Sequence, residues 1–166
     1  MRYKRESSTI RVGERHSAGV TFLVGACDPL LTPRALGPLY DIGRQAGGRL
    51  AALLAAGSPR EELFAALLDE LDQEPARVVV VEDAHWADEA TLDLLVFLGR
   101  RIERTRALLL VTYRDDELPV DQPLRVALGG LPTEAVRRLR LAPLSEVVPA
   151  GDGAVPGKDR EPDGQS

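Results

Sequence analysis

The sequence predicts a layered α/β fold built around a mainly parallel β-sheet. Three apolar runs, 20–28, 77–83 and 107–114, are rich in Val, Leu and other residues that favour strands. Stretches of helical composition separate these runs along the chain. Strands that alternate with helices form parallel sheets with right-handed crossovers, and a strand without polar alternation is buried on both faces.

The composition predicts a single domain and excludes several classes of partner. The chain has 166 residues, 44% of them hydrophobic, which is enough for one packed core. A net charge of -5 provides no basic field for direct nucleic-acid binding. The single cysteine, Cys27, excludes an internal disulfide, and no apolar run is long enough for a membrane span. We therefore expect a cytoplasmic protein without nucleic-acid or membrane partners.

The first third of the chain is expected to contain one strand and one helix. Residues 11–18 have the composition of the last turns of a helix, and the apolar run 20–28 follows as a buried strand. Prolines in 29–39 predict a loop that leads into a helix over 39–57. Several glycines weaken that helix, because glycine is a poor helix former.

The clearest local signal is a helix that starts near residue 58. Ser58 is placed to cap this helix, Pro59 suits its first turn, and Glu61 would complete a capping box. An apolar stripe at helical spacing then follows, formed by Leu63, Phe64, Leu67, Leu68 and Leu71. This stripe is expected to pack against the sheet.

The remaining chain is expected to complete the sheet and end in a tail. Asp88 is interpreted as the N-cap of the helix that follows the strand 77–83. The run 136–144 alternates apolar residues with arginines imperfectly, which predicts an edge strand. Residues 147–166 contain few large apolar side chains, which predicts disorder.

Two adjacent acids, Glu82 and Asp83, stand where the strand 77–83 ends. In open parallel sheets, ligands bind beyond the carboxyl ends of the strands. A rigid apolar strand can fix one carboxylate in the water shell of Mg²⁺ while the next orients or deprotonates an attacking water. Taken alone, the pair is equally compatible with polar residues that simply begin a loop.

The residues around these acids resemble a known family. The segment 82–95, EDAHWADEATLDLL, is similar to the motif of the signal-transduction ATPases with numerous domains, a branch of the AAA+ superfamily. It looks most like the ATPase module of large LuxR-type transcriptional regulators. The resemblance covers 12–146 through FLVGACDPLLTPRALGPLYDIGRQ, RALLLVTYRDDEL and PLRVALGGLPTEAVRRLRLAPLS. It implies a three-layer, partial P-loop NTPase core over 11–146, after an irregular N-terminus at 1–10.

The resemblance implies roles for five residues. Glu82 and Asp83 fall at the positions of the metal-binding and water-activating acids, and which acid serves which role stays open. Arg114 falls at the position of the sensor that detects the γ-phosphate, and Thr112 precedes it in the nucleotide-binding region. His85 belongs to the motif, as a phosphate contact, as a contact across subunits, or as a loop histidine bonded to backbone. The parent family uses ATP and Mg²⁺.

The phosphate-gripping loop of this family has no counterpart in the sequence. The loop has the pattern G-x-x-x-x-G-K-[ST] and precedes the strand 20–28, where Lys4 is the only lysine and no glycine stands before it. Gly157 and Lys158 lie in the predicted tail, with Asp159 where a hydroxyl is needed. We therefore expect a fragment or degenerate relative, incomplete at the N-terminus, with weak or no ATP binding and no useful turnover.

An incomplete sheet has a consequence for partners. The missing first strand would leave an unpaired strand edge and an open apolar groove, so that the chain would self-associate or pair with a full-length relative. A non-enzymatic interaction module is therefore an alternative function. A metal-dependent hydrolase that uses Glu82, Asp83 and His85 is a third, and it needs more convergent ligands than His16 and Asp28 can add.

Overall fold

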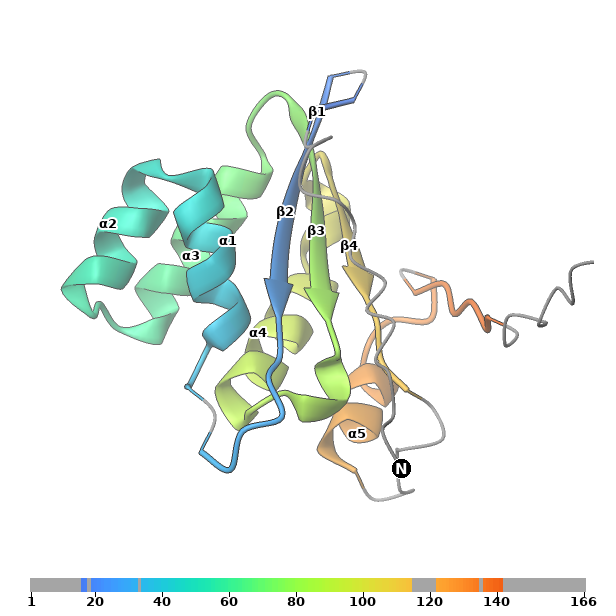
Figure 1. Ribbon diagram of the computed structural model, residues 1–166. Helices are drawn as coiled ribbons and strands as arrows, with labels where there is room; N and C mark the ends of the chain where they lie inside the picture. The colour runs from blue at the N-terminus through green and yellow to red at the C-terminus, as the bar shows by residue number, and fades with distance from the viewer. Residues whose placement is uncertain (1–15, 18, 33, 115–121, 135, 142–166) are drawn as a thin grey trace, which may run out of the picture.

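The structure is a computed structural model, and a four-stranded sheet lies at its centre (Figure 1). The structure describes residues 16–17, 19–32, 34–114, 122–134 and 136–141. The strands, in their order across the sheet, are β1 (His16–Ser17), β2 (Val20–Ala26), β3 (Ala76–Glu82) and β4 (Ala107–Val111). β2, β3 and β4 are parallel, and β1 pairs antiparallel with β2. The predicted α/β fold with a mainly parallel sheet is therefore confirmed.

The helices of the described chain connect and cover these strands. They are α1 (Gly37–Ala46), α2 (Gly48–Ala56), α3 (Arg60–Leu71), α4 (Glu89–Gly99) and α5 (Pro123–Gly129), with short 3₁₀ turns η2 (Ala84–Trp86) and η3 (Ile102–Arg104). Figure 1 shows α1 to α3 on one side of the strands and α4 behind them. Each crossover between parallel strands thus contains helix, as a parallel sheet requires.

The strand register divides the sheet into two apolar faces. Leu23, Val79 and Leu109 are in register, and the next residues along each strand point to the opposite side. We call the side with Leu23, Val79, Val81 and Leu109 the inner face. We call the other side the outer face; its members are Phe22, Val24, Val78, Val80, Leu108 and Leu110.

The core lies between the inner face and the helices. Leu23 and Val79 belong to it together with fully buried leucines of the helices, such as Leu67 of α3 and Leu95 of α4. Helix α1 packs so closely on β2 that a Cβ added at Gly25 would lie 2.3 Å from the Pro38 carbonyl oxygen. The described residues thus form a helix layer on one face of a sheet.

Helix α1 also closes the edge of β2 that β1 leaves uncovered. The Gln45 side chain donates from Nε2 to the Val24 carbonyl oxygen at 2.5 Å, and the Val24 N–H donates to Gln45 Oε1 at 3.0 Å. The Ala26 N–H donates to Asp41 Oδ2 at 3.5 Å. One side-chain amide therefore satisfies both hydrogen-bonding groups of Val24 on this edge, as a neighbouring strand would.

Two helix predictions are corrected in detail. The predicted helix 39–57 is two helices, because Gly47 and Gly48 both have positive φ angles, 71° and 56°, and break the chain between α1 and α2. The capping box at Ser58 is wrong. Pro59, with ψ 146°, is still extended and occupies the N-cap of α3, so the helix begins at Arg60 and no side chain caps it.

Two strand predictions are also corrected. His16 and Ser17, within the predicted helix end 11–18, form β1, because Gly19 with φ 80° turns the chain back into β2. The predicted edge strand 136–144 is not a strand over 136–141, where the structure describes it. Leu139 and Leu141 of that segment are 86% and 92% exposed, so their side chains are not buried against a sheet.

The predicted irregular start 1–10 and the predicted tail 147–166 lie outside the described residues. Among the helices that are described, none combines the length and the hydrophobicity that crossing a bilayer would take.

Candidate functional site

Hydrogen bonds through Thr112 hold the carboxyl ends of β3 and β4 together. The Thr112 N–H donates to the Val81 carbonyl oxygen at 3.0 Å, and the Ala84 N–H donates to the Thr112 carbonyl oxygen at 2.8 Å. The Asp83 N–H donates to Thr112 Oγ1 at 3.2 Å. Thr112 and Asp83, two of the predicted site residues, are thus joined directly at one edge of the sheet.

Asp83 leaves the strand in a left-handed backbone conformation, with φ 54° and ψ 41°. Asp is one of the few residues that adopt this conformation at modest cost, because its short side chain bonds locally. The turn starts η2 and leaves the Asp83 side chain 58% exposed. Its carboxylate therefore faces solvent at the strand end.

Glu82 is the last residue of β3 and is only partly exposed. Its carbonyl oxygen accepts a hydrogen bond from the Cys27 N–H at 2.9 Å, which joins the end of β2 to the same edge. Burial, and then the negative charge of Asp83, raise the pKa of the Glu82 carboxyl above its ordinary value of 4.5. Two neighbouring carboxylates, one of them partly desolvated, are a donor set that suits a hard divalent cation.

His85 lies inward from Asp83. Its side chain is only 3% exposed, and Nδ1 lies 4.0 Å from Asp83 Oδ1. The His85 carbonyl oxygen accepts a hydrogen bond from Gln122 Nε2 at 3.2 Å, which ties the start of α5 to η2. Sequence reasoning missed Gln122, because a glutamine before a proline gives no signal of a contact 37 residues away.

Arg114 lies two residues beyond Thr112, at the same end of β4, and its side chain is exposed. It is the last described residue before the gap at 115–121. The predicted sensor arginine is thus placed at the edge that carries Glu82, Asp83 and Thr112.

Asp88 caps helix α4, as predicted. Its Oδ1 accepts a hydrogen bond from the Thr91 N–H at 3.1 Å, and the Thr91 hydroxyl donates to Oδ2 at 2.5 Å. The Leu36 N–H also donates to Asp88 Oδ1 at 3.4 Å. Asp88 therefore ties the loop between β2 and α1 to the start of α4, a link that local sequence patterns do not reveal.

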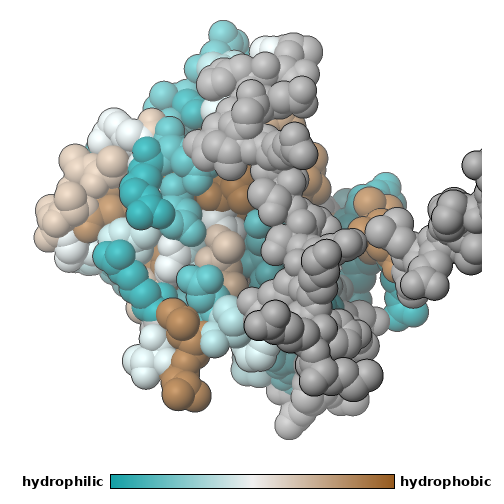
Figure 2. All heavy atoms as spheres, in the orientation of Figure 1, coloured by the Kyte–Doolittle hydropathy of each residue, from teal (hydrophilic) through white to brown (hydrophobic). Residues whose placement is uncertain are grey.

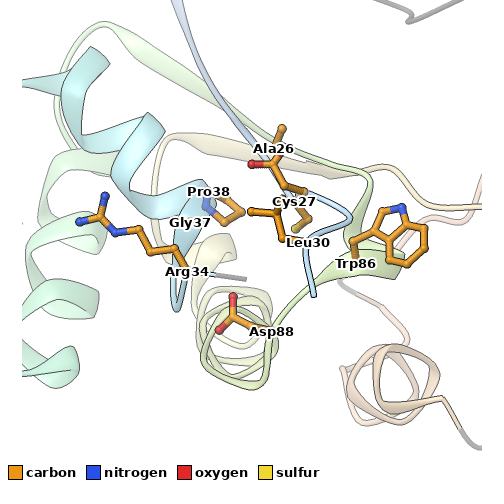
Figure 3. Close-up of a pocket in the computed structure, with 9 residues that line it drawn as sticks. Ala26, Cys27, Leu30, Arg34, Gly37, Pro38, Trp86 and Asp88 are labelled. Atoms are coloured by element: carbon orange, nitrogen blue, oxygen red, sulfur yellow. The ribbon is translucent and has the colours of Figure 1, made fainter. Parts of the chain in front are cut away.

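A shallow pocket lies beside this edge, between the β2–α1 loop and η2 (Figure 3). Its lining residues are Ala26, Cys27, Asp28, Leu30, Arg34, Gly37, Pro38, Trp86 and Asp88. Arg34 extends away from the others in Figure 3, and its guanidinium carbon lies 3.4 Å from the Tyr40 ring centroid. The pocket does not include Glu82 or Asp83.

The loop at this pocket is also hydrophobic at its surface. Leu30 is 57% exposed and Leu31 is fully exposed. Figure 2 shows hydrophobic atoms at the bottom of the view, where this loop lies. Trp86, which belongs to the motif segment 82–95, is 45% exposed and lines the pocket.

The electrostatic character of the edge is negative. Burial, followed by the charges of Asp88, Asp83 and Asp28, raises the pKa of the Cys27 thiol from 9.0 to about 12. These charges act together because the ends of β2 and β3 meet at this edge. The phosphates of a nucleotide would be repelled here unless a cation or a set of N–H donors offset the carboxylates.

The described residues do not contain a cluster of three or more His, Cys, Asp or Glu side chains arranged to hold a metal ion. The hydrolase interpretation with Glu82, Asp83 and His85 therefore lacks the convergent ligands that it requires. A magnesium ion that keeps most of its water ligands needs only one or two carboxylates, so Glu82 and Asp83 remain suitable for that cation.

Comparisons with known proteins identify the family. Residues 8–111 match the AAA ATPase domain, a range that includes Glu82, Asp83 and His85 and ends one residue before Thr112. An uncharacterized protein of Rhizobium meliloti (strain 1021) is 35% identical over 105 residues, which is 59% of this chain and 10% of that protein. The chain thus spans a small part of that relative's length, and no solved structure matches it. Since the family match covers more than half of the sequence, the chain belongs to the AAA ATPase domain family.

Proposed function

We propose that this chain is part of the nucleotide-binding module of a signal-transduction ATPase of the kind found in large LuxR-type regulators. Membership of the AAA ATPase domain family supports a nucleotide-binding role. The finer assignment rests on the motif 82–95 and its similarity to those regulators. In this proposal the carboxyl edge of the sheet, with Glu82, Asp83, Thr112 and Arg114, is the side of the site that faces Mg²⁺ and the γ-phosphate.

The observation that supports this proposal best is the set of hydrogen bonds around Thr112. They fix the backbone that carries Glu82 and Asp83 to a rigid strand end, which lowers the cost of orienting the two side chains toward a ligand. Bound Mg²⁺ would offset the negative charge that the phosphates meet at this edge. Glu82 and Asp83 would hold the cation's water shell and orient a water molecule, and Arg114 would contact the phosphate.

On its own, this chain is proposed to bind ATP weakly or not at all. The 166 residues contain no G-x-x-x-x-G-K-[ST] pattern. In P-loop proteins, the backbone N–H groups and the lysine of the loop with this pattern provide most of the phosphate contacts. Each missing charge-assisted hydrogen bond costs about 1.5–3 kcal/mol of binding free energy. The remaining carboxylates repel phosphate, so Mg²⁺ is required for whatever binding remains.

Calorimetric titration with ATP tests the proposal. We expect this chain to bind ATP with a Kd weaker than about 1 mM, with or without Mg²⁺. A longer form that carries the phosphate loop before residue 20 is expected to bind Mg-ATP at least about a hundredfold more tightly. In that form, Asp83→Asn abolishes hydrolysis, whereas the matched control Asp93→Asn, an exposed acid 52% accessible on α4, leaves it unchanged. If the longer form does not bind ATP, the proposed function is wrong.

A second candidate function is a non-enzymatic interaction module. It is favoured by the sheet edge at β4, where Leu108 and Leu110 are 54% and 41% exposed. Such an edge can accept a strand from another chain.

A further inference from the structure

We propose that a second copy of this chain docks antiparallel along the outer edge of β4, so that the two sheets become one. Among the described strands, the order across the sheet ends at β4, and none pairs with its second edge. Leu108 and Leu110 are 54% and 41% exposed on the outer face beside this edge. A strand edge with exposed leucines is a template for pairing with another chain.

The sequence of β4 lacks the residues that usually protect an edge. Its five residues, Ala107–Val111, include no charged side chain and no proline. Edge strands that stay monomeric usually carry an inward-pointing charge, a proline or a bulge. The opposite edge of the sheet is closed by β1 and by the Gln45 amide on Val24. Strand addition is therefore directed to β4.

The strand β4 is complementary to itself in an antiparallel register centred on Leu109. In that register Ala107 lies opposite Val111 of the second copy, and Leu108 lies opposite Leu110. The twofold axis runs perpendicular to the sheet, so the outer faces of the two copies become continuous. The exposed leucines of both copies then form one patch on that face, and each pair removes apolar surface from water.

Charge complementarity supports the same occupant. Arg106 directly precedes β4, so in the proposed register it lies opposite Thr112 of the second copy. Glu82 follows Val81, which pairs with Val111, so it is the residue of β3 beside Thr112. Arg106 of each copy therefore points across Thr112 toward Glu82 of the other, and the twofold symmetry forms this contact twice.

The present partner of Arg106 does not prevent this exchange. Arg106 pairs with Glu74, but the two side chains are 59% and 78% exposed. Ion pairs at such exposed positions contribute little to stability, so the guanidinium can turn to a partly buried carboxylate at small cost. The dimer thus gains two cross-copy ion pairs in addition to its leucine contacts.

Sedimentation velocity of the full chain over a range of concentrations tests the dimer. We expect reversible dimerisation, and we expect Leu108→Lys with Leu110→Lys to weaken it by at least about a hundredfold, because the lysines of the two copies would lie opposite each other. Val126→Lys is the matched control, because Val126 is an apolar residue 69% exposed on helix α5 and is not part of the β4 edge. A chain that stays monomeric throughout, or a control that weakens the dimer equally, would overturn the proposal.

A charge exchange tests the predicted contact without touching the leucines. Arg106→Glu and Glu82→Arg are each expected to weaken the dimer by about tenfold, and the double variant is expected to recover most of the loss. Additive losses in the double variant would show that Arg106 and Glu82 do not meet across the two copies.

Cysteine cross-linking tests the register. In the proposed pairing the Cβ atoms of Leu108 and of Leu110 in the other copy lie about 5 Å apart, close to the separation that a disulfide needs. Mixing chains with Leu108→Cys and chains with Leu110→Cys under oxidising conditions is expected to give mainly the mixed cross-linked dimer. Equal yields from each variant alone would contradict the register. The native Cys27 is buried and does not compete.

Discussion

The two edges of the sheet are protected in opposite ways. At β2, side chains of helix α1 provide the hydrogen bonds that a neighbouring strand would provide. The Gln45 amide bonds both the N–H and the carbonyl of Val24, and the Asp41 carboxylate accepts from the Ala26 N–H. At β4, the described residues provide no such cover, and Leu108 and Leu110 stay substantially exposed. A single well-placed amide therefore closes the edge of β2. The described residues provide no such group at β4, and this is the edge where we propose that another chain adds.

The largest expected effect is a loss of stability when helix α1 is displaced from β2. Gly25→Ala places a Cβ 2.3 Å from the Pro38 carbonyl oxygen, so α1 has to move away from β2. We expect a loss of about 3 kcal/mol in the free energy of unfolding, because overpacking against backbone cannot be relieved by a rotamer change. Urea unfolding followed by circular dichroism measures it.

Gly37→Ala is the matched control for this substitution. Gly37 begins α1, and a Cβ added there meets no atom within 4 Å. The free energy of unfolding of the Gly37→Ala variant is expected to stay within about 0.5 kcal/mol of that of the natural chain. Equal stability of Gly25→Ala and Gly37→Ala would mean that α1 does not press on β2.

A smaller effect is expected when the amide itself is removed. Gln45→Leu keeps the side-chain size but leaves the Val24 N–H and carbonyl without their partners, at a cost of about 2 kcal/mol. It also opens the β2 edge to strand addition. In a chain whose β4 edge is blocked by Leu108→Lys and Leu110→Lys, Gln45→Leu is expected to restore concentration-dependent association in sedimentation velocity.

The exposed Arg44 on the same helix provides the comparison for Gln45. Arg44 pairs with Asp41, but its side chain is 78% exposed, so Arg44→Ala is expected to change stability only slightly. If Arg44→Ala and Gln45→Leu behave alike in both measurements, the edge of β2 is not closed by the Gln45 amide.

The smallest effect concerns the pH dependence of stability. The pKa of Glu82 is raised in the folded chain above its ordinary value of 4.5. The folded chain therefore holds this proton more tightly than the unfolded chain, and the resulting stability is full below pH 4.5 and lost as the pH rises through the raised pKa. Glu82→Gln stays neutral, so its Tm should exceed that of the natural chain at neutral pH and the difference should vanish at low pH.

Protein concentration sharpens this last measurement. In a dilute, monomeric sample Asp83 is the charged residue, within the described part of the chain, that raises the pKa of Glu82, whereas docking along β4 would bring Arg106 of a second copy close to Glu82. The gain in Tm from Glu82→Gln should therefore shrink as the dimer forms. A Tm difference that is independent of both pH and concentration would contradict the raised pKa and the contact with Arg106.

Much of the fold could be predicted from strongly patterned segments. The runs 20–28 and 107–114 contain β2 and β4, and the run 77–83 contains all of β3 except Ala76, because long Val- and Leu-rich runs favour buried strands in almost any context. The failures occur where a single residue decides the backbone. Pro59 delays the start of α3 by one residue, and Gly19 turns a predicted helix end into β1. The predicted strand at 136–144 was wrong for another reason: a strand is stable only when it pairs with a neighbouring strand.

For the candidate site, the sequence predicted positions but not connections. Glu82, Asp83 and Thr112 do meet at one edge, as parallel strands require of residues at their carboxyl ends. The link from Asp88 to Leu36 and the link from Gln122 to His85 join segments 52 and 37 residues apart, and only tertiary packing determines them. The raised pKa of Cys27 likewise depends first on its burial and then on the charges of Asp88, Asp83 and Asp28, which the fold brings to one edge.

At the left-handed turn of Asp83, the residues that the backbone conformation allows differ from those that the proposed chemistry requires. At φ 54° the chain accepts Asp, Asn and Gly, and it penalises β-branched residues whatever the solvent around them. A library at this position sorted for folded protein would thus retain those three residues together. If Asp83 has the role that we propose, the same library sorted for nucleotide turnover, in a form that carries the phosphate loop, would retain the acid alone. Under that proposal, Asp83 is a position where loss of chemistry can be observed in an intact fold.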